Sequence, residues 1–229
     1  MKTRAEIKAI AKENFKANYW PAVGIVVLMT IIIGAVSSTG IGGLAVPALT
    51  VGLCFYSIAL YFGDKENATL GEIFNVGFAK FGRNLGSFIL QGLLIFAWSL
   101  LFCIPGIIKS FSYAMAPYIL ADCPEVSAVD AITLSRRMMN GHKWEYFVFQ
   151  LSFIGWAFLS GISFGLVGVF YAFPYITAAY GGYYAELKKY CVETGVVTEA
   201  QFAGAPLDGS AAAPADVVVD SVVADDTQE

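Results

Sequence analysis

Apolar residues in this chain are gathered into six long runs that are separated by short polar stretches. The runs cover about residues 20–38, 46–62, 86–104, 107–121, 146–163 and 168–187. An α-helix rises 1.5 Å per residue, so roughly 20 residues are needed to cross the hydrocarbon core of a bilayer. Most runs are long enough, and the short fourth run must tilt, thin the bilayer or form a hairpin with the third. The pattern predicts an all-α membrane protein with six transmembrane helices in three hairpins.

A more polar segment with helical periodicity precedes each pair of runs. These segments are residues 1–18, 69–84 and 127–141. In the last of them, small or apolar residues recur at 128, 131, 134, 135 and 138, which is one side of a helix with 3.6 residues per turn. Water disfavours the apolar side, and a transmembrane helix cannot bury the polar side. Each hairpin is therefore predicted to be preceded by a cytoplasmic amphipathic helix that lies along the membrane interface.

The three amphipathic segments begin alike. A Ser or Thr is followed three residues later by an acid, as in a capping box, where each side chain bonds the backbone N–H at the other position. The pairs are Thr3 and Glu6, Thr69 and Glu72, and Ser127 and Asp130. Repetition at a similar spacing predicts that residues 1–191 form a polytopic membrane domain of three repeat units, about 1–63, 64–121 and 122–187. The alternative is chance, since capping boxes and apolar runs are both common.

Prolines and small residues predict how the later helices bend and pack. Pro117 and Pro174 lie inside the fourth and sixth runs, where a proline removes one helical hydrogen bond and bends the helix. Small residues recur every four positions at 157, 161 and 165, and again at 177, 181 and 185. Such faces allow close helix contact. They predict that the fifth and sixth runs pack together, with homodimerisation as the alternative.

The composition fits a membrane protein, and the distribution of charge predicts an orientation. Of the 229 residues, 57% are hydrophobic and 14% are charged, whereas a soluble domain has nearer one quarter charged residues. Lys and Arg precede the first run, follow the last, and lie between runs two and three and between runs four and five. The other loops, near 39–45, 104–106 and 164–167, carry no charge. The positive-inside rule places both termini and both long loops in the cytoplasm.

Residues 192–229 differ in charge from the rest of the chain. They contain eight of the 18 acids and no Lys or Arg, whereas residues 1–191 hold all 14 basic residues and the other ten acids, a net charge of +4. With little aromatic content and no strong period, residues 192–229 are predicted to form a disordered acidic cytoplasmic tail. A partner-binding segment within residues 217–223 is the alternative to a purely solvated tail.

No combination of residues predicts a catalytic, cofactor or metal site. Residues Gly161–Gly165 match G-x-S-x-G, but this pattern needs a strand–turn–helix and a histidine partner. Here it lies in an apolar run, and the one histidine, His142, is at the cytoplasmic end of that hairpin. One histidine and four scattered cysteines have no metal-ligand spacing. The sequence therefore favours a protein that is not an enzyme.

Basic residues form two candidate sites. The first is a set of lipid-headgroup contacts between runs four and five, namely Arg136, Arg137, His142 and Lys143. Such a cluster binds anionic headgroups, with ordinary positive-inside charge as the alternative. The second is an intramembrane polar site, Lys109 with Tyr113 one turn on. Lys109 either binds an anionic group that enters from outside, or lies about 6 Å below the outer turn and extends its ammonium to the surface.

Several short motifs carry a resemblance to a known family. They are Pro105–Lys109, Tyr113, Pro117–Asp122, Ala131, Ser135, Met139, Gly141–Lys143, Phe153–Trp156 and Pro174–Tyr175. Over about residues 1–190 the chain resembles the bacterial integral membrane family catalogued as domain of unknown function 975. The resemblance implies a protein of the cytoplasmic membrane in a Gram-positive bacterium. It implies no known activity and no catalytic residues, and it does not extend to residues 192–229.

Two functions are compatible with these features. The first is a non-enzymatic, lipid-interacting, accessory or scaffold protein whose partners are the anionic lipids of the inner leaflet, with no cofactor and no nucleic acid. The second is a small transporter or permease component, in which the bent fourth and sixth helices and Lys109 line a path. The acidic tail is the candidate segment for a protein partner.

Overall fold

All regular structure in the described part of the chain is helical. The computed structural model describes residues 1–64, 69–101, 103–205 and 207. Its first elements are α1 (Arg4–Ala17), α2 (Tyr19–Ser38), the 3-10 helix η1 (Gly40–Ala45) and α3 (Val46–Phe62). They are followed by α4 (Leu70–Ala79), α5 (Phe81–Leu101), α6 (Cys103–Tyr113) and α7 (Ala116–Asp122). The last are α8 (Ala128–Met138), α9 (Lys143–Leu151), α10 (Ile154–Ile162), the π-helix η2 (Gly168–Ala172), α11 (Phe173–Glu193) and α12 (Glu199–Phe202). The all-α fold class is confirmed.

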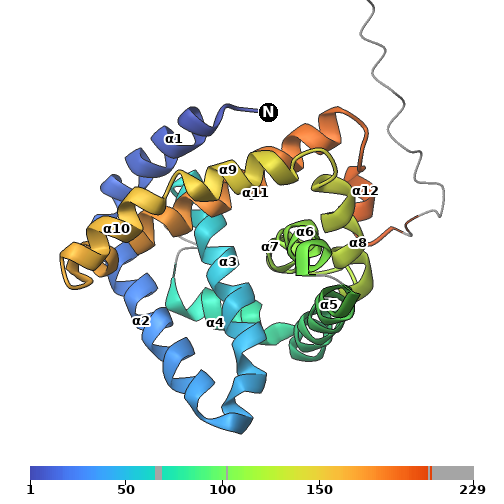
Figure 1. Cartoon of the computed structure of the whole chain (residues 1–229), viewed down its shortest axis with the longest axis horizontal. Helices are drawn as coiled ribbons and strands as arrows, with labels where there is room; N and C mark the ends of the chain where they lie inside the picture. The colour runs from blue at the N-terminus through green and yellow to red at the C-terminus, as the bar shows by residue number, and fades with distance from the viewer. Residues whose placement is uncertain (65–68, 102, 206, 208–229) are drawn as a thin grey trace, which may run out of the picture.

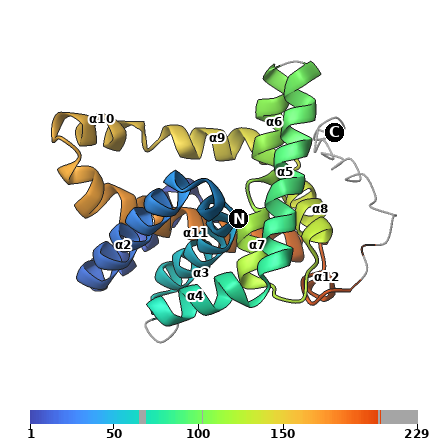
Figure 2. The same cartoon turned by 90° about the horizontal axis from the view of Figure 1, so that it is seen from below.

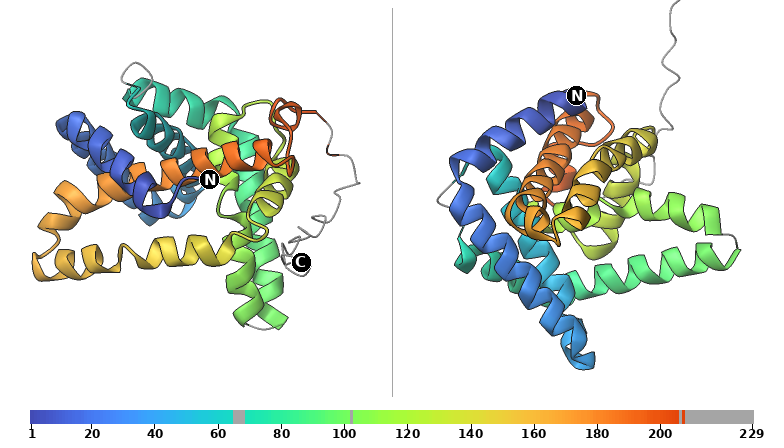
Figure 3. Two further views of the ribbon diagram at one scale, coloured as in Figure 1. Left: turned by 90° about the horizontal axis from the view of Figure 1, so that it is seen from above. Right: turned by 60° about the vertical axis from the view of Figure 1, so that its left-hand side comes forward.

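Three helical hairpins leave a common centre in different directions. In Figure 1 the hairpin of α2 and α3 points downward, and the hairpin of α9–α10 and α11 turns back at the left. Figure 2 shows α5 and α6 upright, with α9 and α10 in a horizontal row to their left. In the right-hand view of Figure 3, the α5–α6 hairpin and α2 also point in different directions. The apolar runs thus do not form one bundle of side-by-side helices. A short helix (α1, α4 or α8) precedes each hairpin, and the equivalence of the three units as repeats stays a prediction.

The helix α3 is the centre from which the hairpins diverge. It packs against α1, α2, α4, α5, α7 and α11. Glycines allow the closest of these contacts. A Cβ atom on Gly52 would overlap the backbone carbonyl of Ile73, and one on Gly77 would overlap that of Ala48, so α3 and α4 touch backbone to backbone.

Three helical stretches in the described residues are long and apolar enough to cross a membrane. They are Tyr19–Ser38, Gly42–Phe62 and Lys143–Ile162, which coincide with the first, second and fifth predicted runs. In the second, 56% of the apolar window is buried inside the protein, against 22% and 17% in the other two. The apolar character of α3 therefore serves mainly the protein core, whereas α2 and α9–α10 expose apolar side chains.

The fourth predicted run is two short helices rather than one bent helix. α6 ends at Tyr113, and α7 begins at Ala116 with Pro117 in its first turn. The first N–H groups of a helix have no helical acceptor, so a proline there starts a helix instead of bending one. With 11 and 7 residues, neither helix is long enough to cross a bilayer alone. Pro174 differs, because the π-helix η2 runs directly into α11 and Ala172 has helical backbone angles, so this proline lies within a continuous helical stretch as predicted.

The amphipathic helix α1 buries its apolar face inside the protein. Its capping box is present, because the Thr3 hydroxyl accepts from the Glu6 N–H (3.3 Å) and the Glu6 carboxylate accepts from the Thr3 N–H (2.7 Å). Ile7, Ala11 and Phe15 are fully buried, and α1 packs against α11 and α3. The prediction that this face lies on lipid is wrong, because other helices of the chain cover it.

The other two predicted interfacial helices differ from each other. Their N-caps are as predicted, with the Ser127 hydroxyl accepting from the Asp130 N–H (3.1 Å) and the Thr69 hydroxyl from the Glu72 N–H (3.4 Å). The apolar face of α8 is buried, as in α1. On α4, Phe74 and Phe78 are partly exposed and stack in a row with Phe81 at the start of α5. α4 therefore keeps the aromatic surface that an interfacial helix requires.

The small residues of α11 face α3 instead of α10. A Cβ atom on Gly181 would overlap the backbone carbonyl of Ser57, and one on Gly182 would overlap the ring of Tyr61. Nothing outside its own helix approaches within 4 Å of the equivalent position on Gly161, and α10 contains no buried residue. The fifth and sixth runs do pack together, as the stacking of Trp156 on Tyr171 shows, but the contact does not use the predicted small-residue faces.

The helical part of the chain extends beyond the predicted domain boundary at residue 191. α11 continues to Glu193, and a capping box of Thr198 and Gln201 starts α12. Val197 and Phe202 are buried. The start of the acidic tail at residue 192 is therefore predicted too early. Its remainder, residue 206 and residues 208–229, lies outside the described residues.

Candidate functional site: a basic recess beside α8

Four basic side chains lie around one recess of about 390 Å³, hereafter the basic recess. It lies between α6, α8 and the first turn of α9. Its lining residues are Lys109, Ser112, Thr133, Arg136, Arg137, Asn140 and Lys143. No acid is among these lining residues. A concave surface with this charge attracts anions and raises their local concentration.

Helical spacing places the α8 residues of the recess on one side of that helix. Thr133, Arg136 and Arg137 follow the pattern i, i+3 and i+4, and Asn140 lies in the turn after α8. The next residue, Gly141, has a φ of +84°, a conformation that glycine adopts without a steric penalty. The chain turns there, and the first residue of α9 returns to the recess. The cluster that the sequence predicts around residues 136–143 therefore forms from one helix face and one turn.

Ser135 sets the position of α6 against α8. Its buried hydroxyl donates to the carbonyl oxygen of Ser112 (2.8 Å) and accepts from the N–H of Met115 (3.2 Å). Both backbone groups lie at the break between α6 and α7, where helical partners are missing. The hydroxyl satisfies both groups, and it holds the end of α6 that carries Lys109 beside α8.

Lys109 lies with the α8 cluster and not across a membrane from it. Its ammonium nitrogen is 4.6 Å from the centre of the Trp98 ring on α5, which is a cation–π contact. The topology predicted from loop charges separates Lys109 from Arg136 and Lys143 by a membrane thickness. One recess contains all three in the structure, so that separation is wrong. The reason is that α6 is short and packs against α8.

Two other predicted site residues do not line the basic recess. Tyr113 is buried in a small apolar cluster. The Nδ1 atom of His142 lies 3.2 Å from the carboxylate of Glu145, and the imidazole packs edge-on against Tyr190. The recess thus combines Lys109 from one predicted site with the arginines and the lysine from the other.

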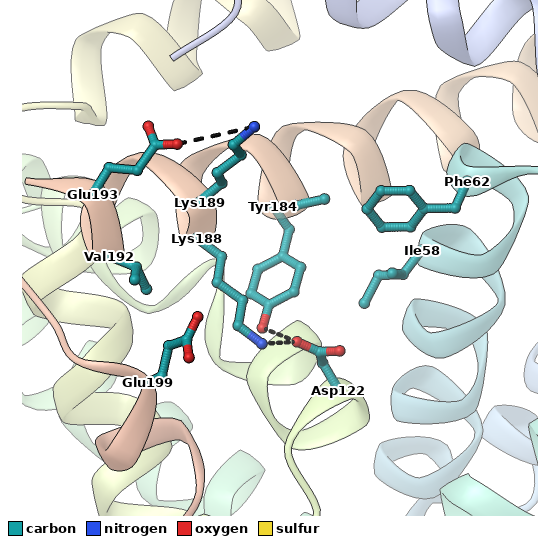
Figure 4. A pocket seen from close by; sticks show the side chains of 10 residues that line it. Ile58, Phe62, Asp122, Tyr184, Lys188, Lys189, Val192, Glu193 and Glu199 are labelled. Carbon is teal, nitrogen blue, oxygen red and sulfur yellow. Dashed lines mark hydrogen bonds and ion pairs between the residues drawn. The ribbon is translucent and has the colours of Figure 1, made fainter.

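A second cavity, of about 440 Å³, lies between α3, α7, α11 and α12 (Figure 4). The Lys188 ammonium and the Tyr184 hydroxyl both donate to one carboxylate oxygen of Asp122, at 2.5 and 2.9 Å. Burial alone would lower the pKa of Lys188, but the hydrogen bond and charge of Asp122 outweigh it and raise that pKa. Lys189 lies 3.9 Å from the carboxylate of Glu193. Two of the three acids that line this cavity pair with its two lysines, and Glu199 is the third, so the cavity does not gather positive charge as the basic recess does.

Glu186 is a buried acid that the sequence-based sites omit. Its carboxylate accepts from the Lys2 ammonium (2.8 Å) and from the Tyr61 hydroxyl (3.1 Å), which links α11 to the N-terminus and to α3. The sequence does contain a signal for this residue, because Glu186 lies inside the sixth apolar run and an acid in such a run needs a partner. Its partners come from distant parts of the chain, and no local pattern indicates them.

Metal ligation and thiol chemistry gain no support from the described residues. They contain no group of three or more His, Cys, Asp or Glu side chains that could hold a metal ion. Burial raises the pKa values of Cys123 and Cys191 to about 11, so both are thiols near neutral pH. Metal binding and nucleophilic attack both require the thiolate.

The part of the chain that contains the recess matches a known protein family. The model of a family described as "Protein of unknown function (DUF975)" matches residues 100–190. The resemblance is confirmed over this range. The range includes every residue that lines the basic recess, and for the preceding residues the resemblance stays a prediction. No curated protein and no solved structure matches the chain.

Proposed function

We propose that this chain is a non-enzymatic membrane protein that binds anionic phospholipid headgroups in the basic recess. The observation that carries the proposal is the gathering of four cations, with no acid among the lining residues, around one concave surface. In this proposal the three hairpins insert into the cytoplasmic membrane. Both termini and the recess then lie on the cytoplasmic side, where the anionic headgroups of the inner leaflet are available.

An apolar surface next to the recess supports a lipid rather than a soluble anion. Trp98, which contacts Lys109, is 40% exposed. Further large apolar side chains of the α5–α6 hairpin are exposed, namely Leu93, Phe96, Leu100, Ile107 and Ile108. A phospholipid with its phosphate in the recess would lay its acyl chains along this hairpin. Each CH₂ group that leaves water contributes about 0.8 kcal/mol, so apolar contact adds to the attraction of the charges.

Removal of two recess charges is expected to weaken the binding of phosphatidylglycerol about 30-fold. Each Lys or Arg near anionic lipid contributes about 1 kcal/mol, and about 2 kcal/mol corresponds to that factor. The variant is Lys109→Gln with Arg136→Gln in one chain. Native mass spectrometry of the protein in a neutral maltoside detergent counts the retained lipid. Phosphatidylcholine should bind weakly to the wild type and the variant alike.

The matched control removes the same charge elsewhere. Lys12 and Lys16 are exposed on α1, and Lys12→Gln with Lys16→Gln should leave lipid retention unchanged. An equal loss in both variants would show that net charge, and not the basic recess, binds the lipid. Added inorganic phosphate distinguishes a site for a lipid headgroup from a site for a soluble anion. Displacement of the lipid by phosphate at a similar concentration would identify a site for a soluble anion instead.

The proposed orientation predicts a pattern of cysteine labelling in intact cells. Leu166, which directly follows the turn at residues 163–165, is 62% exposed, and Lys12 is exposed on α1. An impermeant maleimide is expected to label Leu166→Cys and not Lys12→Cys, both in a Cys103→Ser background, because the uncharged loop faces outward. The native Cys123 and Cys191 should stay unlabelled, since both are buried thiols with raised pKa values. Labelling of Lys12→Cys alone would reverse the orientation.

A further inference from the structure

A segment of the chain itself has the charge that the basic recess attracts. Residues 208–229 contain no Lys, Arg or His. They contain six acids, which are Asp208, Asp216, Asp220, Asp225, Asp226 and Glu229. The recess has four cations and no acid among its lining residues. One chain therefore carries a cationic surface and an anionic segment of comparable charge.

The described chain ends beside the helix that carries the recess. Gly204 packs against the turn before α8, where a Cβ atom would lie 3.1 Å from the carbonyl oxygen of Glu125. Ser127, two residues after Glu125, is the N-cap of α8. Leu207 then packs against the core. Residues 208–229 are thus attached near the N-terminal end of α8.

The recess is close to this attachment point. Arg136 follows Ser127 by nine residues of α8, which is about 14 Å along the helix. The 22 residues 208–229 span up to about 70 Å when extended, so the acids can reach the recess. Covalent attachment also gives a segment an effective concentration in the millimolar range. A separate anion at lower concentration must compete with it.

We propose that residues 208–229 dock in the basic recess and compete there with anionic lipid. The contact joins carboxylates to Lys109, Arg136 and Lys143, and it weakens as the salt concentration rises, because exposed charges are screened. The competition with lipid rests on the lipid site proposed above. The docking itself is independent of that proposal, because it depends only on the charges of the recess and of residues 208–229.

Zero-length crosslinking tests the docking in the full chain. A carbodiimide activates a carboxyl group, and a lysine amine in contact with it then forms an amide and releases the urea. In neutral detergent, without lipid and at low salt, we expect amides from Lys109 or Lys143 to acids of residues 208–229, found by mass spectrometry of peptides. The exposed pair of Lys80 and Glu125, 3.2 Å apart, is the internal positive control.

Three results would each overturn the docking. The first is a link between Lys80 and Glu125 without any link from residues 208–229 to the recess lysines. The second is linkage of residues 208–229 to the exposed lysines of α1 as often as to Lys109 and Lys143. The third is that the links join two chains, which a mixture of isotope-labelled and unlabelled protein would reveal.

A neutral segment tests the competition. The full chain with all six acids replaced by Asn or Gln is expected to bind phosphatidylglycerol several-fold more tightly than the wild type at low salt, and the difference should shrink at high salt. A chain with residues 208–229 in scrambled order keeps the charge and should bind as the wild type does. Unchanged binding by the neutral variant would overturn the competition. If neither the wild type nor the neutral variant bound lipid, both the competition and the proposed function would be overturned. The crosslinks would still test the docking.

Discussion

Gly181→Ala is expected to destabilise the protein by about 3 kcal/mol. The added methyl group would overlap the backbone carbonyl of Ser57 on α3 and lie 2.7 Å from the backbone nitrogen of Ile58. Both are backbone atoms, so no side-chain rotation relieves the overlap, and α3 and α11 must separate. α3 also packs against α1, α4 and α7, so the separation disturbs several helices. The thermal midpoint in detergent, followed by circular dichroism, should fall by roughly 6–12 °C.

Gly92→Ala is the matched control. Gly92 lies within α5, and nothing outside its helix approaches within 4 Å of the position of the missing Cβ atom. Because alanine favours a helix more than glycine does, the change should be neutral or stabilising by up to about 1 kcal/mol. An unchanged midpoint for Gly181→Ala would contradict the close crossing of α3 and α11. Equal losses for both variants would show that the crossing is not the cause.

The starts of helices could be predicted from the sequence, and their packing partners could not. A capping bond joins residues three positions apart, so Thr3 and Ser127 identify the starts of α1 and α8 without any knowledge of the fold. A face of small residues around Gly181 predicts that some helix approaches closely. It does not identify that helix, and the structure places Ser57, from a much earlier part of the chain, opposite it.

An apolar face on an amphipathic helix is ambiguous for a related reason. Ile7, Ala11 and Phe15 suit lipid or the protein interior, because both surroundings are apolar. The structure covers them with α3 and α11, and the ring of Tyr171 packs edge-on against Phe15. Only the tertiary contacts distinguish the two surroundings, and they involve residues far apart in the sequence.

The candidate site was predicted in part. Helical spacing alone places Arg136 and Arg137 on one face of α8, and the turn at Gly141 is visible as Asn-Gly. The addition of Lys109 depends on the hydrogen bonds that Ser135 makes to the end of α6. A rule that counts charges in loops cannot detect that contact, and it therefore assigns Lys109 to the wrong side.

The second large effect is expected at Arg83, at the start of α5. Its Nη1 atom donates to the carbonyl oxygens of Cys123 (3.1 Å), Pro124 (2.6 Å) and Val126 (3.1 Å), and its Nη2 atom donates to that of Leu120 (2.7 Å). These carbonyls belong to the end of α7 and to the turn before α8, where helical N–H partners are missing. One planar side chain thus supplies the hydrogen bonds of a whole turn.

Arg83→Lys should destabilise the protein by about 2–5 kcal/mol although it keeps the charge. An ammonium carries its donors on one nitrogen and lacks the fork of a guanidinium, so it cannot reach carbonyls on both sides of the turn. Each buried carbonyl that loses its donor costs roughly 1–3 kcal/mol, and at least two are left without one. The turn also sets the direction of α8. Retention of phosphatidylglycerol should therefore fall at temperatures where circular dichroism still shows a folded protein.

Lys80→Met separates hydrogen-bond geometry from charge at the same turn. The Lys80 ammonium donates to the carbonyl oxygen of Pro124 (2.7 Å) and to the carboxylate of Glu125 (3.2 Å), and both contacts are exposed. Exposed pairs contribute about 0–1 kcal/mol, so this substitution should change the free energy of unfolding by less than about 1 kcal/mol. It removes a positive charge, whereas Arg83→Lys removes none. If Lys80→Met were the more destabilising of the two, positive charge near the turn, and not the guanidinium fork, would hold α8 in place.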